Sequence, residues 1–245
     1  MKELPPQEPQ QQQQEHEPQL LVCTVGIVDG HFLSRAGLKA LTASLEGFRC
    51  VWCAHAAAHA EEKLKLRVPD ILLVDVVLPD SNGLDFVRAL HVRYPQLKIL
   101  VISVYDEMLY TDRVLKAGAR GYLKKDSEAE SFESALRTVS TGRPFVTSAV
   151  SEHLLTAYYE GHRRGADGGL HLLSDREFEV LQLLGKGLNT ARISSHLGIS
   201  PKTVDVHRGK IKKKLDYKYA ADVVRMAMRW VETGGLVRGP EQSQH

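Results

Sequence analysis

The chain has 245 residues, of which 43% are hydrophobic and 25% are charged, and its formal net charge is +2 at pH 7. A chain of this length forms one large domain or two small ones, and this composition excludes a wholly disordered protein. Its three cysteines argue against a disulfide scaffold and for a reducing cytoplasm. No apolar run is long enough to span a membrane, and the first residues lack the apolar segment of a secretory signal, so neither a signal nor a membrane contact is expected.

Residues 1–19 form a segment of low complexity that is rich in Gln and Pro. Such a segment cannot bury enough apolar surface to fold, so it is predicted to be a disordered tail without a specific function. Residues 1–18 contain one Lys against four Glu, which makes the tail acidic.

Residues 20–140 alternate between two kinds of hydrophobic pattern. Continuous apolar runs are typical of strands buried on both faces, and the segments between them have the period of amphipathic helices. This order predicts an α/β domain, a doubly wound five-stranded parallel sheet whose ligands bind at the carboxyl ends of its strands. The apolar runs are 22–28, 48–52, 71–74, 99–102 and 121–123, and helical segments include 32–45, 83–94, 109–117 and 131–139.

Residues 141–171 are predicted to be a linker that contains one short helix at 148–159. The segment 158–169 is polar and rich in Gly, which is typical of a flexible connection.

Residues 172–237 have helical periodicity throughout, which predicts a small all-α domain of four helices. Ser174 and Glu177 form a capping box that opens the first helix, while Ser200 caps a later helix whose first residue is Pro201. Two helices joined by a tight turn at Gly198 indicate a helix-turn-helix. The helices are expected at 174–186, 190–197, 201–215 and 219–233, and residues 238–245 form a short tail.

The positive charge of the chain lies in this C-terminal part. Residues 171–237 contain 12 Lys and Arg against 7 Asp and Glu, whereas residues 19–140 are neutral. The basic run 210–214 could be an ordinary solvated helix face, but its place in a helix-turn-helix favours a nucleic-acid contact. The near-neutral total is therefore an average over unlike regions.

Polar residues follow the apolar strands at the sheet edge where ligands bind. Asp75 alone could be a structural acid at a helix entry or a nucleophile for phosphoryl transfer. Asp29, Ser103 and Lys125 follow three other strands, where sheet packing gives no reason for polar side chains. Together these four residues offer an acceptor carboxylate, a metal-binding acid, a hydroxyl and a cation for a phosphoryl group.

On these residues, the region 20–140 resembles the CheY-like receiver domain of two-component response regulators. The resemblance implies that a histidine kinase phosphorylates Asp75, that Asp29 and Asp75 bind Mg²⁺, and that Ser103, Tyr122 and Lys125 form the switch. Movement of Ser103 and Tyr122 would then repack the surface around the fourth helix and fifth strand. The matching motifs are 27–31 (IVDGH), 75–79 (DVVLP) with Gly83, 102–103 (IS) and 118–126 (GARGYLKKD).

The first strand departs from the receiver pattern at Gly30. The family normally has two adjacent acids there, and the second is usually a metal ligand. Since Mg²⁺ requires several oxygen ligands, the loss of one is expected to lower its affinity. Two hypotheses stay open: control by phosphorylation, or a phosphorylation-independent receiver that is switched by protein or ligand binding.

The region 172–237 resembles the LuxR/NarL-type helix-turn-helix. The resemblance rests on 173–181 (LSDREFEVL), 187–188 (GL), Ile193, 197–207 (LGISPKTVDVH), Ile211 and 214–215 (KL). It implies a recognition helix in the major groove, with phosphate contacts from Lys202, Thr203 and His207 and a guanine contact from Arg208. The full set of expected DNA-binding residues is Lys202, Thr203, Asp205, Val206, His207, Arg208, Lys210, Lys213 and Lys214.

Two positions depart from the helix-turn-helix pattern. Asp205 occupies a groove-facing position that is often basic or polar, where it could accept from a cytosine amino group or repel phosphate. Arg192 stands where an acid is common and could add a phosphate contact.

Together the two resemblances imply a cytoplasmic DNA-binding response regulator that controls transcription and is not an enzyme. Phosphorylation by a histidine kinase would gate dimerisation and binding to double-stranded DNA, as a homodimer on paired half-sites.

Two weaker motifs remain. Cys50 and Cys53 fit C-x-x-C, but residues three apart on a strand face opposite sides of a sheet, so no redox pair is predicted. His55 and His59 lie four apart on a predicted helix, but without an H-E-x-x-H motif no zinc site is predicted.

Overall fold

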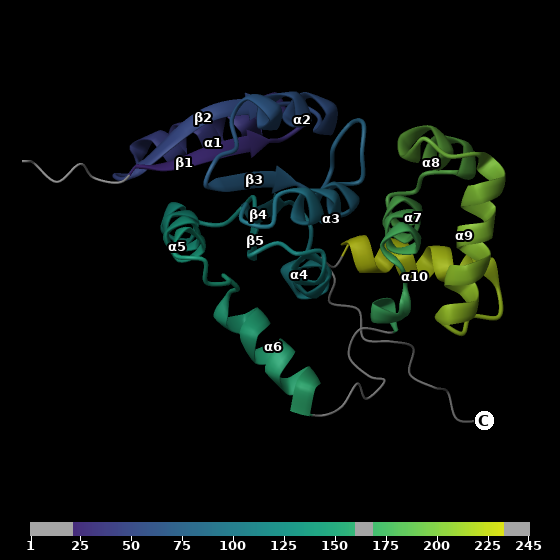
Figure 1. Ribbon diagram of the computed structural model, residues 1–245. Coiled ribbons are helices and arrows are strands. Elements are labelled where there is room, and N and C mark those ends of the chain that lie inside the picture. Colours follow the sequence, from purple (N-terminus) through teal and green to yellow (C-terminus); the bar gives the residue numbers. More distant parts are fainter. Residues whose placement is uncertain (1–21, 160–168, 233–245) are drawn as a thin grey trace, which may run out of the picture.

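The computed structural model describes residues 22–159 and 169–232 (Figure 1). The predicted tails at 1–19 and 238–245 lie outside these ranges, as does most of the predicted Gly-rich connection. No helix within the described ranges is both long enough and apolar enough to cross a membrane.

The N-terminal domain is built on a five-stranded parallel sheet with the strand order β2-β1-β3-β4-β5. Residues of α1 and α5 pack on one face, while α2, α3 and α4 cover the other. The predicted fold class is thereby confirmed. The strands are β1 (Cys23–Val28), β2 (Phe48–Ala54), β3 (Ile71–Asp75), β4 (Lys98–Ser103) and β5 (Gly121–Lys124), and the helices are α1 (Phe32–Ser44), α2 (Ala57–Leu66), α3 (Gly83–Arg93), α4 (Glu107–Lys116) and α5 (Ala129–Ser140).

The turn from β3 into α3 depends on Gly83. A Cβ atom at Gly83 would lie 2.5 Å from both the Cα and the carbonyl oxygen of Val76, a separation that real structures do not tolerate. The side chain of Asn82 caps α3 by accepting hydrogen bonds from the backbone N–H groups of Leu84 and Asp85. The chain therefore turns back tightly between the end of β3 and the start of α3.

The C-terminal domain is a bundle of α7 (Asp175–Gly185), α8 (Thr190–Leu197), α9 (Pro201–Lys214) and α10 (Ala220–Glu232), preceded by α6 (Ser148–Tyr159) and a 3-10 turn, η1 (Leu170–Leu172). The capping box of Ser174 and Glu177 and the cap at Ser200 are both present, as predicted. Gly198 adopts φ +61°, the left-handed conformation that ends α8 and starts the turn into α9.

Strand β2 contains a bulge at Val51. Val25 pairs with Cys50 and the next residue of β1, Gly26, pairs with Trp52, so Val51 has no partner on β1. The extra residue shifts the alternation of side chains, and Cys50 and Cys53 consequently face the same side of the sheet, against α1 and α5. The expectation that these two cysteines face opposite sides is therefore wrong.

Candidate functional site

The predicted polar residues converge at the carboxyl edge of the sheet. Asp29 directly follows β1, Asp75 and Ser103 end β3 and β4, and Lys125 directly follows β5. The ammonium of Lys125 lies 2.6 Å from Oδ2 of Asp75 and 2.8 Å from Oδ2 of Asp29. Because both carboxyl groups are buried, one cation compensates two negative charges that water cannot reach freely.

The two carboxyl groups have different environments. Burial tends to raise the pKa of Asp29, but bonds from Lys125, from the Ser34 hydroxyl and from the His31 N–H outweigh it, so the pKa is lowered. Burial dominates at Asp75 and raises its pKa, although Lys125 and the N–H of Val77 oppose this. Asp29 is thus held as a fixed anion, whereas Asp75 is the carboxyl group whose charge is least compensated.

His31 joins the two acids, although no role for it follows from the sequence. Its Nδ1 lies 3.6 Å from Oδ1 of Asp29 and 3.7 Å from Oδ2 of Asp75, and its side chain is largely exposed. One potential ligand atom from each of Asp29, His31 and Asp75 lies within 4.8 Å of the others. The signal was its place in the IVDGH motif, directly after the missing acid.

The donor set fits a hard divalent cation. Two carboxylates supply oxygen ligands, and Gly30 is exposed and contributes none, so water would complete the coordination of Mg²⁺, which retains water readily. A Cβ atom at Gly30 would lie 3.2 Å from Cδ of Pro79 and 3.7 Å from the carbonyl oxygen of Val77, so it would pack against the loop that follows β3. The acidic group is typical of a receiver Mg²⁺ site.

Ser103 and Tyr122 belong to one buried chain of polar and aromatic groups. Ser103 accepts a hydrogen bond from the N–H of Tyr105 at 3.4 Å, and the hydroxyl of Tyr122 donates to the carbonyl oxygen of Tyr105 at 2.7 Å. The ring of Tyr105 stacks on that of Tyr110 with their centroids 4.9 Å apart. Burial raises the pKa of Tyr105 to about 12, so this phenol stays neutral. Lys125, which with Asp29 and Asp75 forms the acid pocket, donates its backbone N–H to the carbonyl oxygen of Ser103 at 2.8 Å. The contacts therefore lead from the acid pocket into α4.

Helix α4 carries this chain into the C-terminal domain. The hydroxyl of Tyr110 donates to Oε1 of Gln182 at 2.9 Å. The rings of Tyr110 and Phe178 pack edge to face with their centroids 5.3 Å apart. Phe178 in turn packs against Trp230 of α10, with the ring centroids 5.4 Å apart. No motif marks Tyr110 or Gln182, because their contact joins positions that are 72 residues apart in the sequence.

Arg113 is the most connected side chain of this domain interface. Its guanidinium donates to the carbonyl oxygens of Leu170 and Leu173, both at 2.9 Å, and to Oδ1 of Asp175 at 2.8 Å. It also lies 4.6 Å from the centre of the Phe178 ring. Arg88 of α3 pairs with the other oxygen of Asp175, and Asn82 donates to Glu179. The interface therefore fixes α7 against α3 and α4.

The predicted recognition helix α9 lies on the far side of the C-terminal domain from the sheet (Figure 1). Arg208 donates to Oγ1 of Thr190 at 2.8 Å and lies 3.6 Å from Oδ1 of Asp205, so it is held between α8 and α9. Thr203 shares a hydrogen bond with Ser200 at 2.8 Å. The exposed residues of the predicted set are Lys202, Asp205, Val206, Lys210, Lys213 and Lys214.

Two residues of the predicted DNA-binding set also face their own domain. Nδ1 of His207 is buried without a hydrogen-bond partner among the described residues, and burial lowers its pKa, which disfavours a charged contact with phosphate. Lys214 donates to Oε2 of Glu177 at 2.7 Å, which ties the end of α9 to α7. Periodicity alone does not reveal either contact.

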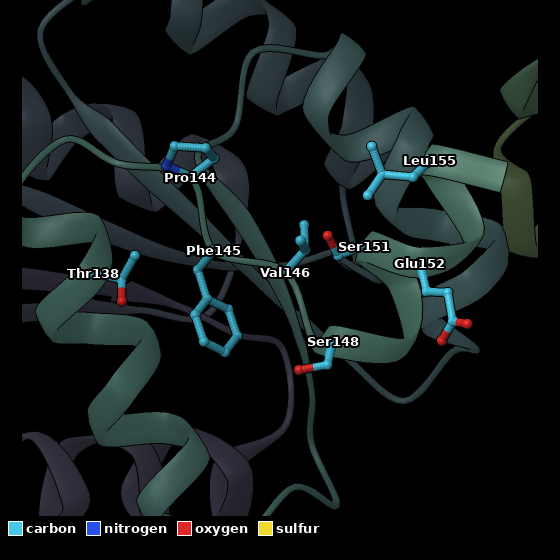
Figure 2. A pocket seen from close by; sticks show the side chains of 8 residues that line it. All are labelled: Thr138, Pro144, Phe145, Val146, Ser148, Ser151, Glu152 and Leu155. Carbon is cyan, nitrogen blue, oxygen red and sulfur yellow. The ribbon is translucent and has the colours of Figure 1, made fainter. Parts of the chain in front are cut away.

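A separate open groove of about 610 Å³ lies where α5 leads into α6, between the ring of Phe145 and the side chain of Leu155 (Figure 2). Its other lining residues are small, apolar or hydroxyl-bearing apart from Glu152, and none belongs to the acid pocket. This groove therefore offers no constellation for phosphoryl chemistry.

Comparisons with known proteins identify both the N-terminal and the C-terminal domain. Residues 25–137 match the family described as response regulator receiver domain, and residues 171–227 match that described as bacterial regulatory proteins, luxR family. The chain is 33% identical over 221 residues to the transcriptional regulatory protein DegU of Brevibacillus brevis, covering 84% of this chain and 94% of DegU. It is 31% identical to the oxygen regulatory protein NreC of Staphylococcus haemolyticus, covering 83% and 95% of the two chains.

Solved structures show the same fold. RcsB of Salmonella enterica serovar Typhimurium, bound to the promoter P1flhDC in the presence of phosphomimetic BeF3-, aligns with a TM-score of 0.64 at 20% identity, over 85% of this chain and 99% of RcsB. Another structure, of two RcsB dimers bound to two parallel DNAs, aligns with a TM-score of 0.52 at 21% identity, over 83% of this chain and 96% of RcsB.

Proposed function

This chain belongs to the DNA-binding response regulators that join a receiver domain to a LuxR-type helix-turn-helix, and we propose that phosphorylation of Asp75 controls it through the domain interface. It is a transcription regulator and not an enzyme. A histidine kinase would supply the phosphoryl group, and the protein would bind its DNA in the cytoplasm. The observation that carries the proposal is the series of contacts from Asp75 through Lys125, Ser103, Tyr105 and Tyr110 to Phe178.

The pocket supports acceptance of a phosphoryl group by Asp75. Lys125 bonds Asp75 now and offers a cation to the phosphoryl oxygens afterwards. Asp29 and Asp75 would hold Mg²⁺, which would neutralise charge on the phosphoryl oxygens, and His31 lies beside both. The missing acid at Gly30 would weaken this Mg²⁺ site.

The switch would act through Ser103, Tyr105 and Tyr122. A phosphoryl group on Asp75 would accept a hydrogen bond from the Ser103 hydroxyl and draw this oxygen away from the Tyr105 N–H, which now donates to it. Since Tyr105 also accepts from Tyr122 and stacks on Tyr110, a shift of this backbone would disturb α4. The contacts of α4 with α7 would then weaken, and the C-terminal domain would be released.

The interface does not need to cover α9 in order to control DNA binding. The interface contacts described above lie on α7 and η1 and reach α10 through Phe178, while the outer residues of α9 are exposed. By fixing α7 against α4, the interface would prevent two copies from placing both α9 helices in successive turns of the major groove. Release would permit a homodimer on paired half-sites, with Arg208 reading a base and Lys202, Thr203, Lys210 and Lys213 contacting phosphates.

The test compares the wild-type chain with Asp75→Asn, each treated with acetyl phosphate and Mg²⁺. Intact mass spectrometry should show one phosphoryl group on the wild type and none on the variant. Promoter DNA should be bound more tightly after treatment only by the wild type. An unmodified Asp75 at millimolar Mg²⁺ would refute control by phosphorylation.

A second function is favoured by Gly30 alone. A receiver whose metal site is too weak for phosphorylation would instead be switched by a bound protein or ligand, while the same interface released the DNA-binding domain. Promoter binding that is unchanged by acetyl phosphate in the wild type, but becomes responsive in Gly30→Asp, would support this alternative.

A further inference from the structure

Strand β2 carries a closely spaced pair of thiols that the phosphoryl pocket does not use. The sulfur atoms of Cys50 and Cys53 lie 3.6 Å apart, close enough to share a hydrogen bond. The bulge at Val51 places both on the same face of the sheet, and both side chains are partly accessible and not joined by a disulfide. The two thiols are therefore in contact with each other and partly exposed to solvent.

The surroundings of the pair favour a thiolate on Cys53. The pKa of Cys53 is lowered to about 7, mainly by the hydrogen bond from Cys50 and also by Lys39 and Arg35 of α1, against the opposing effect of burial. For Cys50, the contact with Cys53 raises the pKa, and burial adds to this. The pair therefore has one thiol suited to attack and one suited to hold its proton.

The third cysteine provides an internal comparison. Cys23 of β1 is also partly accessible, but burial and the negative charge of Asp70 raise its pKa. At neutral pH it should be the less reactive thiol.

We propose that Cys50 and Cys53 form a thiol–disulfide redox pair, with Cys53 as the attacking thiol and a low-molecular-weight disulfide as the oxidant. The Cys53 thiolate attacks one sulfur of the small disulfide, whose S–S bond breaks and releases one small thiolate. Cys50 then loses its proton and attacks Cys53 of the mixed disulfide, which releases the second small thiolate. In total the protein loses two electrons and two protons, and the small disulfide becomes two thiols.

The position of the pair allows this closure. The sulfur atoms, 3.6 Å apart, must approach to the disulfide bond length of about 2.05 Å, a shift of roughly 1.5 Å. Strand β2 is at the edge of the sheet and pairs with β1 alone. The bulge at Val51 already interrupts this pairing with β1 between residues Cys50 and Trp52. An edge strand with a bulge can move further than the central strands, which are held on both sides.

The reduced full-length chain would be incubated with oxidised glutathione at pH 7, quenched with acid and alkylated. Intact mass spectrometry and peptide mapping would then locate each modification. We expect a disulfide between Cys50 and Cys53 with no retained glutathione, formed roughly tenfold faster than any adduct on Cys23.

Matched variants separate the two steps. Cys50→Ser should retain one glutathione on Cys53, Cys53→Ser should react slowly, and Cys23→Ser should form the disulfide as the wild type does. A wild-type chain that keeps a glutathione adduct on Cys53 would show that the sulfurs cannot close and would overturn the proposal. Equal reaction rates of Cys23 and Cys53 would overturn it as well.

Discussion

The acid pocket and the surface of α9 differ in how far the protein alone determines their geometry. In the pocket, Lys125 bonds both Asp29 and Asp75, and all three groups are fixed by strand ends before any phosphoryl group arrives. On α9, the side chains are exposed or bonded to their own domain, as Arg208 is to Thr190. The pocket is therefore preorganised, whereas the DNA contacts must form when DNA binds.

The domain interface lies between these two regions and determines whether one can affect the other. Arg113 is its strongest single element, because three charge-assisted bonds and one ring contact converge on a nearly buried guanidinium. Arg113→Ala should weaken the closed arrangement by roughly 3 kcal/mol and raise DNA affinity of the unphosphorylated chain up to about a hundredfold.

The matched control for Arg113 is Lys116→Ala on the same helix. Lys116 is 71% exposed and pairs only with its neighbour Asp112 among the described residues, so DNA affinity should not change. If Arg113→Ala binds promoter DNA no better than the wild type, the interface does not restrain DNA binding.

Substitutions on α9 test whether its contacts divide into base reading and phosphate contacts. Arg208→Ala should lower the preference for promoter over random DNA by roughly 1–3 kcal/mol. Lys210→Ala should weaken binding to both sequences alike and reduce the slope of log affinity against log salt concentration by about one. Binding measured on both duplexes over a range of salt separates the two effects, and an equal loss on both duplexes for Arg208→Ala would contradict its assignment.

Gly30 tests the limit of the preorganised pocket. Gly30→Asp adds an oxygen ligand beside Asp29 and should raise Mg²⁺ affinity about tenfold, as measured by calorimetry. Gly30→Ala is the control, since its Cβ makes the same 3.2 Å contact with Pro79 but brings no ligand. Equal affinities for the two variants would show that the missing acid does not limit the metal.

The smallest expected effect concerns the ion pair between α9 and α7. Burial tends to raise the pKa of Glu177, but Lys214 and the backbone of Ser174 lower it more, so the folded pKa is below the ordinary value of 4.5. The stabilisation is present above that value and is lost as the pH falls through the folded pKa.

Glu177→Gln should therefore cost about 1 kcal/mol of unfolding free energy at pH 7 and nothing at low pH. Denaturant unfolding followed by far-UV circular dichroism at several pH values checks this. A cost that does not change with pH would show that the charge of Glu177, and so its ion pair with Lys214, does not contribute to stability.

The sequence predicts the residues of the acid pocket better than the contacts that connect the pocket to the C-terminal domain, and the reason is physical. Asp75 and Lys125 follow apolar strands, and strands of a parallel sheet end at one edge, so their meeting follows from local pattern. Tyr110 and Arg113 act across the domain interface, and no periodicity indicates their partners. Cys50 and Cys53 lie on the same face of the sheet because of the bulge at Val51, and the sequence pattern does not indicate this bulge.

Control of DNA binding by the receiver requires that a phosphoryl group at Asp75 opens the interface between α4 and α7. Amide hydrogen exchange of the full chain, with and without beryllofluoride and Mg²⁺, measures this directly. Faster exchange is expected in α4 and α7 on activation, and no change is expected in Asp75→Asn. Unchanged exchange at these helices, together with tighter DNA binding, would contradict it.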